Sequence, residues 1–207
     1  MKIYLVKNID AFDKSFVEKC ITFFPKWRKE KMLRYRHTKG KIQNGLAYIL
    51  LIHALRKEGI FKEMPEFCYN EHDKPFLRNY PGWYFNFSHS KTSVCCVLSK
   101  KDVSIDIEEV GEYKENLAIY ICNNKELNDL HKSNNKKDDF YKLWTRKEAV
   151  FKLIGTGITN EIKDILNTPH INRSHRPTVL LSGALHRTHR KCDRHLHPNA
   201  RQVFLLL

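Results

Sequence analysis

The sequence lacks the patterns that mark several large classes of protein. It has no run of about 18 apolar residues, so it offers no candidate for a membrane-spanning helix. Its glycines form neither a Walker phosphate-binding loop nor a G-x-G-x-x-G dinucleotide-binding loop. Its six cysteines include no C-x-x-C pair, and no apolar secretory leader opens the chain. We therefore expect reduced thiols and a cytoplasmic protein.

The chain carries a large excess of positive charge. It has 37 Lys and Arg residues against 23 Asp and Glu residues, which gives a formal net charge of +14. Such an excess suggests an anionic partner: nucleic acid, an acidic protein surface or a polyphosphate ligand. The basic stretch at residues 26–41 keeps a nucleic-acid-binding protein open as an alternative. No nucleic-acid reader motif accompanies it, so we do not expect a nucleic-acid partner.

The composition changes abruptly near residue 168. Residues 1–167 hold 30 basic and 22 acidic residues, whereas residues 168–207 hold seven basic residues, six of them Arg, and one acidic residue. The same 40 residues hold six of the eleven histidines. Either a disordered basic tail or an altered reading frame would explain the change, and we favour the altered frame because the preceding domain stops unfinished. Zinc binding by residues 186–197 is a weaker alternative, since chance spacing is common in a histidine-rich tract.

Hydrophobic periodicity predicts alternating strands and helices over the first 167 residues. We expect strands at 2–7, 66–69, 83–87, 93–98 and 103–107, and another beginning at 160–166. We expect helices at 11–23, 42–55, 113–121, 125–130 and 140–153, the last ended by Gly155 and Gly157. Residues 70–82 read as a turn-rich gap. The polar break at 99–102 is the predicted boundary between two halves.

Two short segments carry three acidic side chains on regular elements. In SIDIEE, Asp106 and Glu108 project from one face of the predicted strand. In WTRKEAVFK, Glu148 and Lys152 lie one helical turn apart. Each pair alone is most often a charged strand end or a surface ion pair. Together they are what a magnesium ion holding a substrate phosphate would require.

A third segment precedes these two. In YFNFSHS, an aromatic strand ends in Ser88 and His89, whose hydroxyl and imidazole could donate hydrogen bonds to phosphate oxygens. Alone, this is a polar turn after a strand. In order, FNFSHS, SIDIEE and WTRKEAVFK resemble the phosphopantetheinyl transferase family, of the type that activates surfactin synthetase. The resemblance runs from about residue 1 to about residue 165.

The resemblance implies a specific reaction and a set of roles. Such enzymes use magnesium and transfer the 4′-phosphopantetheine arm of coenzyme A to a serine of an acyl or peptidyl carrier protein. Asp106, Glu108 and Glu148 match the metal ligands of the family. Glu148 also matches the base that deprotonates the serine, and Lys152 matches the residue that clamps the diphosphate. The residues that match coenzyme A contacts are Arg28, Lys31, Lys41, Lys74, Pro75, Ser88 and His89. Glu126 matches an acidic residue whose role varies between members, and we expect a monomer.

The family also implies a fold, and the chain departs from it in two places. The implied fold is α+β, with two similar halves related by a pseudo-two-fold, each a small sheet packed on a long helix. We assign residues 1–100 to the N-terminal half, 101–167 to the C-terminal half with the metal site, and 168–207 to an atypical Arg/His-rich tail. Ser104 replaces a more usual glycine, at little cost if its backbone angles are ordinary. The atypical end leaves open an incomplete second half and an inactive copy of such an enzyme.

Overall fold

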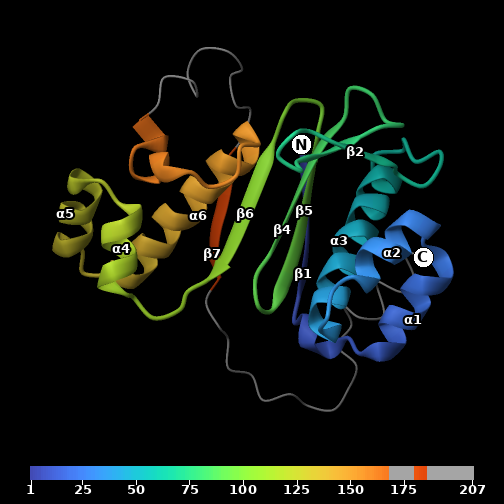
Figure 1. Cartoon of the computed structure of the whole chain (residues 1–207), viewed down its shortest axis with the longest axis horizontal. Coiled ribbons are helices and arrows are strands. Elements are labelled where there is room, and N and C mark those ends of the chain that lie inside the picture. Colours follow the sequence, from blue (N-terminus) through green and yellow to red (C-terminus); the bar gives the residue numbers. More distant parts are fainter. Residues whose placement is uncertain (168–179, 186–207) are drawn as a thin grey trace.

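The computed structural model describes residues 1–167 and 180–185. Figure 1 shows a central group of strands with α1, α2 and α3 on one side and α4, α5 and α6 on the other. The elements of the first half are β1 (Lys2–Lys7), the 3-10 turn η1 (Ile9–Ala11), α1 (Lys14–Phe23), α2 (Lys26–Leu33), α3 (Thr38–Lys57), β2 (Phe67–Tyr69), β3 (Pro75–Leu77), β4 (Tyr84–His89) and β5 (Ser93–Ser99). Strands β1, β5 and β4 form an antiparallel sheet in that order, and β2 pairs with β3 in a separate hairpin.

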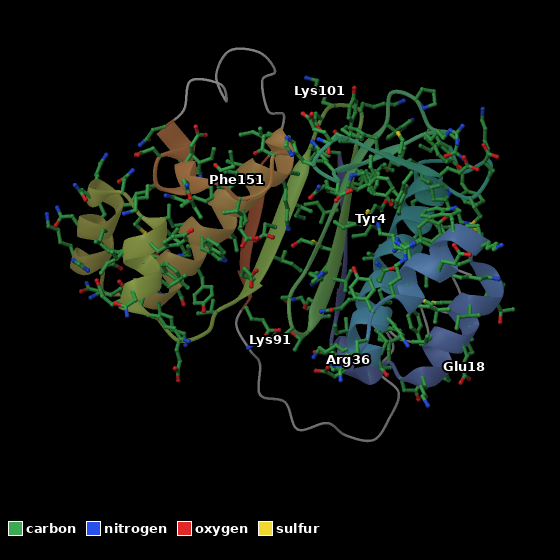
Figure 2. All side chains as sticks on the ribbon, in the orientation of Figure 1. Tyr4, Glu18, Arg36, Lys91, Lys101 and Phe151 are labelled. Atoms are coloured by element: carbon green, nitrogen blue, oxygen red, sulfur yellow. The ribbon has the colours of Figure 1, made fainter. Side chains whose placement is uncertain are left out.

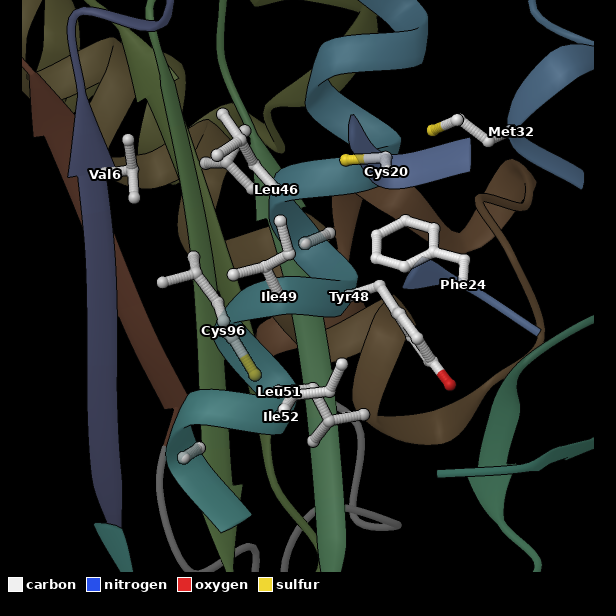
Figure 3. Packing of buried hydrophobic residues seen from close by; sticks show 14 of the residues in the cluster. Val6, Cys20, Phe24, Met32, Leu46, Tyr48, Ile49, Leu51, Ile52 and Cys96 are labelled. Atoms are coloured by element: carbon white, nitrogen blue, oxygen red, sulfur yellow. The ribbon is translucent and has the colours of Figure 1, made fainter. Parts of the chain in front are cut away.

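Helix α3 forms the centre of the first core. It is apolar on most sides because it lies between the sheet and helices α1 and α2. Figure 3 shows Ile49 pointing toward the strands, while Tyr48 lies beside Phe24, with ring centroids 5.0 Å apart. Gly45 allows the close approach of α1, since a Cβ at this position would stand 3.1 Å from the Cys20 Sγ atom. The first half thus has a large, continuous apolar core.

The second half is smaller. Its described elements are β6 (Ser104–Glu109), α4 (Glu115–Ile121), α5 (Asn124–Lys132), α6 (Lys136–Ile154), the 3-10 turns η2 (Asn160–Lys163) and η3 (Ile165–Asn167), and β7 (Leu180–Leu185). Helix α6 packs against β6 and β7, which pair in parallel. Gly155 ends α6 with a left-handed φ of 79°, as predicted.

The two halves meet where β6 runs beside β4 (Figure 1). Two side chains of β4 accept hydrogen bonds from the backbone of β6: Asn86 Oδ1 from the Ile105 amide at 3.2 Å, and Ser88 Oγ from the Ile107 amide at 3.2 Å. Cys95 and Val97 of β5 form a small buried cluster with Val103, Ile105 and Ile107 just before and along β6. The position of β6, which carries two of the predicted metal ligands, is therefore set partly by polar side chains of the first half.

The α+β fold with small sheets is confirmed, and most predicted elements are present with shifted ends. One prediction is wrong: residues 160–166 form 3-10 turns, not a strand. Thr159 accepts a hydrogen bond from the Glu161 amide, and Ile162 and Ile165 are buried three residues apart, which suits a helical turn. The gap at 70–82 also contains the short strand β3, which the sequence did not predict.

Three other expectations concern thiols, membranes and the tail. Cys20, Cys68, Cys95, Cys96 and Cys122 are free thiols, and among the described residues no helix is both long and apolar enough to span a membrane. The residues of the zinc alternative lie outside the described part of the chain. Within residues 168–207 the structure describes β7, which extends the second half beside β6.

Candidate active site

Three carboxylates from two elements converge at the junction of the halves. Asp106 and Glu108 project from the same face of β6, and Glu148 approaches them from α6. One oxygen from each lies within 4.8 Å of the others. Asp106 is 1% exposed, and its buried Oδ2 atom has no hydrogen-bond partner among residues 1–167 and 180–185. A buried carboxylate oxygen without a partner is costly, and a cation bound by the three carboxylates would remove that cost.

The electrostatics of the cluster also favour a cation. Burial, followed by the charges of Asp106 and Glu148, raises the pKa of Glu108 to about 7. Burial, followed by the charge of Asp106, raises the pKa of Glu148 to about 7. Carboxyl groups this close repel one another when ionised. The donor set consists of carboxylate oxygens, which are the ligands that magnesium prefers. The residues present therefore fit the predicted magnesium ion.

Lys152 lies next to the carboxylates on the following turn of α6. Its Nζ atom is 2.5 Å from Asp106 Oδ1 and donates to Ser88 Oγ at 2.9 Å. Ser88 in turn donates to Asp106 Oδ1 at 2.8 Å. The pKa of His89 is lowered, first by burial and then by the charge of Lys152. Two predicted side chains, Lys152 and Ser88, thus donate to the same carboxylate oxygen, Asp106 Oδ1.

A cavity of about 400 Å³ opens from the carboxylates toward α2 and α3. The three carboxylates and Lys152 line it. Five of the predicted coenzyme A contacts also line it: Arg28, Lys31, Pro75, Ser88 and His89. Arg28 is 2% exposed, and its guanidinium donates to the Asn44 carbonyl at 2.5 Å. Its Nε atom is buried and has no hydrogen-bond partner in the described part of the chain, although this cavity lies beside it. Lys31 donates to the Tyr69 hydroxyl at 2.7 Å.

Two predicted contacts do not line this cavity. Lys41 does not line the cavity. Helix α3 contributes other residues to its wall, among them Gly40, Gln43 and Asn44. Lys74 lines a second cavity of about 400 Å³, which shares Pro75, Phe87, Glu148 and Lys152 with the first. The two cavities therefore adjoin at Glu148 and Lys152.

Sequence reasoning missed Lys147, the residue before Glu148. Its side chain is fully buried, and its ammonium group donates to the carbonyls of Ile121, Ile162 and Lys163 at 2.8–2.9 Å. It also pairs with Glu126 at 2.6 Å. Glu126 is thus not part of the carboxylate cluster. It completes a capping box with Asn123 and neutralises Lys147. The sequence did contain a signal for a buried lysine, because Lys147 stands between positions of a predicted helix that were expected to be buried.

Comparison with known proteins gives the class to which this site belongs. Residues 102–203 match the family described as the 4′-phosphopantetheinyl transferase superfamily. The chain belongs to this superfamily. The match reaches beyond β7, so it includes most of the residues that we expected to form an atypical tail. The altered reading frame stays a prediction that sequencing of the coding DNA tests.

Similar proteins come from several bacteria. The chain is 27% identical over 162 residues to 4′-phosphopantetheinyl transferase Sfp of Bacillus subtilis (strain 168), covering 77% of this chain and 72% of that protein. It is 30% identical over 158 residues to 4′-phosphopantetheinyl transferase gsp of Aneurinibacillus migulanus, covering 75% and 64%. It is 31% identical over 118 residues to 4′-phosphopantetheinyl transferase AcpT of Escherichia coli (strain K12), covering 54% and 59%.

Proposed function

We propose that this protein transfers the 4′-phosphopantetheine arm of coenzyme A to a serine hydroxyl of an acyl or peptidyl carrier protein. The observation that carries the proposal is the cluster of Asp106, Glu108 and Glu148 beside Lys152, at the mouth of a cavity that holds the buried cation Arg28. Membership of the superfamily supports the same reaction. The partners are coenzyme A and the carrier protein, and the protein acts as a monomer.

In this proposal the residues of the first cavity bind and orient the diphosphate. Asp106, Glu108 and Glu148 would hold magnesium, which would supply neutralisation of the negative charge on the diphosphate. Arg28 and Lys31 bind the phosphate on the nucleotide side, with Pro75, Ser88 and His89 completing that wall. For Lys41 the role of a coenzyme A contact stays a prediction.

Glu148 accepts the proton of the carrier serine as its oxygen bonds to the phosphorus that bears the pantetheine arm. The bond from this phosphorus to the oxygen of adenosine 3′,5′-bisphosphate breaks. Lys152 stabilises the charge on that leaving oxygen, for which it must move away from Asp106 Oδ1.

We further propose that residues 1–100 and 101–167 are two similar halves related by a pseudo-two-fold. Each has a long helix packed on strands: α3 of 20 residues on the β1-β5-β4 sheet, and α6 of 19 residues on β6, beside which β7 (Leu180–Leu185) from the following segment pairs. The boundary falls between the end of β5 at Ser99 and the start of β6 at Ser104. A site between the halves explains why each supplies part of the chemistry.

Mass spectrometry of carrier proteins tests the proposed function. The purified chain, with magnesium and coenzyme A, is expected to add the mass of the pantetheine arm to an apo acyl carrier protein or an apo peptidyl carrier domain. Glu148→Gln should abolish this labelling without unfolding the chain, whereas the matched control Glu161→Gln, at an exposed position on η2, should keep it.

The same assay tests whether this chain is an inactive copy. Labelling only after residues 168–207 are replaced by the corresponding segment of an active relative would show that the family chemistry is intact but this chain is broken. Failure of both forms to label either carrier would contradict the proposed transferase activity. Full activity of Glu148→Gln would contradict the role given to that residue.

A further inference from the structure

Lys74 lies where three segments meet: the loop between β2 and β3, the turn before β6 and the end of α6. It belongs to the loop between β2 and β3, yet its Nζ atom donates to the Leu153 carbonyl of α6 at 2.6 Å. The same atom lies 3.3 Å from Asp102 Oδ1 and 3.5 Å from Asp102 Oδ2, just before β6. The side chain of Lys74 is 9% exposed. Its ammonium group thus contacts an acceptor on α6 and an acceptor on the turn that leads into β6, the two elements that carry the carboxylate cluster.

The rest of the loop supports this contact. Asn70 Oδ1 accepts hydrogen bonds from the backbone amides of His72 and Lys74 at 3.0 and 2.8 Å, which fixes the loop. Asn70 Nδ2 donates to the Gly155 carbonyl at 3.2 Å, just past the end of α6. A Cβ at Gly155 would stand 2.8 Å from Lys74 Cδ, so the lysine stem packs directly on the helix end. The loop therefore caps the last turn of α6 through two side chains.

A cation at this place has a clear physical effect. The last carbonyls of a helix have no partners within the helix, and the helix dipole places negative charge there. Lys74 supplies both a donor and a positive charge, and Asp102 balances that charge. Figure 2 shows Lys101, which precedes Asp102, and Phe151, near the end of α6, at the same end of the molecule, with Lys91 at the opposite end. The loop thus joins the start of β6 to the end of α6.

We propose that Lys74 is a positioning residue: it fastens the start of β6 to the last turn of α6, and so fixes Asp106 and Glu108 relative to Glu148 and Lys152. This role differs from the coenzyme A contact that the family resemblance implied for Lys74. Leu153 directly follows Lys152, so loss of its partner frees the turn that carries the lysine. The inference rests on the proposed function only where it concerns turnover, because the arrangement of the carboxylates can be measured without any carrier protein.

The first test uses the protein alone and manganese as the probe metal. Lys74→Met should weaken Mn²⁺ binding, measured by electron paramagnetic resonance, by about 10- to 100-fold, the range found when outer partners of metal ligands are removed. Amide hydrogen exchange should accelerate in residues 150–155 and stay unchanged in α3. Lys74→Arg should restore much of both properties, since it keeps the charge and the donors. Lys62→Met, an exposed lysine of the same half, is the matched control and should change neither.

The second test separates positioning from ligand contact. Adenosine 3′,5′-bisphosphate should bind Lys74→Met and the native chain within about twofold in Kd, while any carrier labelling shows a fall in kcat rather than a rise in KM for coenzyme A. The proposal would be overturned if manganese affinity and amide hydrogen exchange were unchanged while nucleotide binding weakened about tenfold. Lys74 would then be a contact of coenzyme A. If the native chain labels no carrier, the manganese and exchange results still decide the role of Lys74.

Discussion

Helices α3 and α6 have nearly the same length, 20 and 19 residues, and each packs against the strands of its own half, but they bury different side chains. The buried side chains of α3 belong to the continuous apolar cluster of the first half. Helix α6 buries Phe140, Val150 and Phe151, and also the charged side chain of Lys147. Both halves have an apolar cluster, but the long helix of the second half also buries a charged side chain, whereas the long helix of the first half buries apolar ones.

This difference suits the division of labour in the site. Apolar packing is spread over many residues, and single changes remove only part of it. Buried polar contacts are fewer and directional, so they fix the position of particular side chains more sharply. The carboxylates and Lys152 belong to the half with directional contacts, and the first half supplies Ser88, Asn86 and Lys74 to hold them.

The largest expected effect comes from removing the buried charge of the second half. Lys147→Met leaves three carbonyl oxygens and Glu126 without their partner, and we expect a loss of about 3–5 kcal/mol in the free energy of unfolding. Urea denaturation followed by circular dichroism measures it. Lys142→Met, on the exposed side of the same helix, should change stability by less than about 0.5 kcal/mol. A loss below about 1 kcal/mol in Lys147→Met would show that the second half does not depend on this ion pair.

A truncation in the apolar core of α3 tests the other side of the comparison. Leu51 is fully buried, and Leu51→Ala should cost about 2–5 kcal/mol, through lost transfer free energy and the cavity left behind. The same denaturation measurement applies. Because the carboxylate cluster lies in the other half, manganese affinity at a temperature where the variant is folded should remain that of the native chain. A large loss of metal affinity in Leu51→Ala would show that the halves are not stabilised independently.

The difference between the halves also explains what could be predicted from the sequence. Helix α3, the sheet strands and the carboxylates follow from local patterns: an apolar run, alternation, and acidic residues spaced by two on a strand. The partners of Lys147, Glu126 and Lys74 could not be predicted, because each contact joins segments separated by at least 15 residues. The segment 160–166, expected as a strand, has local signals for its 3-10 turns at Thr159 and in the spacing of Ile162 and Ile165, and it also makes a distant contact. Its carbonyls at Ile162 and Lys163 accept from Lys147, which no local pattern indicates.

A smaller effect is expected at the hydrogen bonds between the halves. Ser88→Ala removes the acceptor of the buried Ile107 amide and one donor to Asp106, at an expected cost of about 1–3 kcal/mol. Ser99→Ala, also buried on a strand of the same sheet but bonded only to the nearby Lys101 amide, should cost less, about 0.5–1.5 kcal/mol. Denaturation gives both values, and manganese affinity should fall in Ser88→Ala alone. Equal behaviour of the two variants would remove the special role of β4 in holding β6.

The smallest effect is the pH dependence of the carboxylate cluster. The pKa values of Glu108 and Glu148 are both raised to about 7, so the folded chain keeps protons that the unfolded chain loses near pH 4.5. The contribution of these groups to stability is therefore complete below about pH 4.5 and is lost as the pH rises through about 7. Both side chains are only half-buried and water screens them. We therefore expect Tm without metal to be about 2–4 °C lower at about pH 8 than at about pH 5, and the fall to be smaller in Glu108→Gln.

Magnesium binds the ionised carboxylates, so it should raise Tm more at about pH 8 than at about pH 5. Differential scanning calorimetry at both pH values measures this. A magnesium effect of equal size at the two pH values would mean that the ion binds elsewhere, and that the directional contacts of the second half do not serve a metal site.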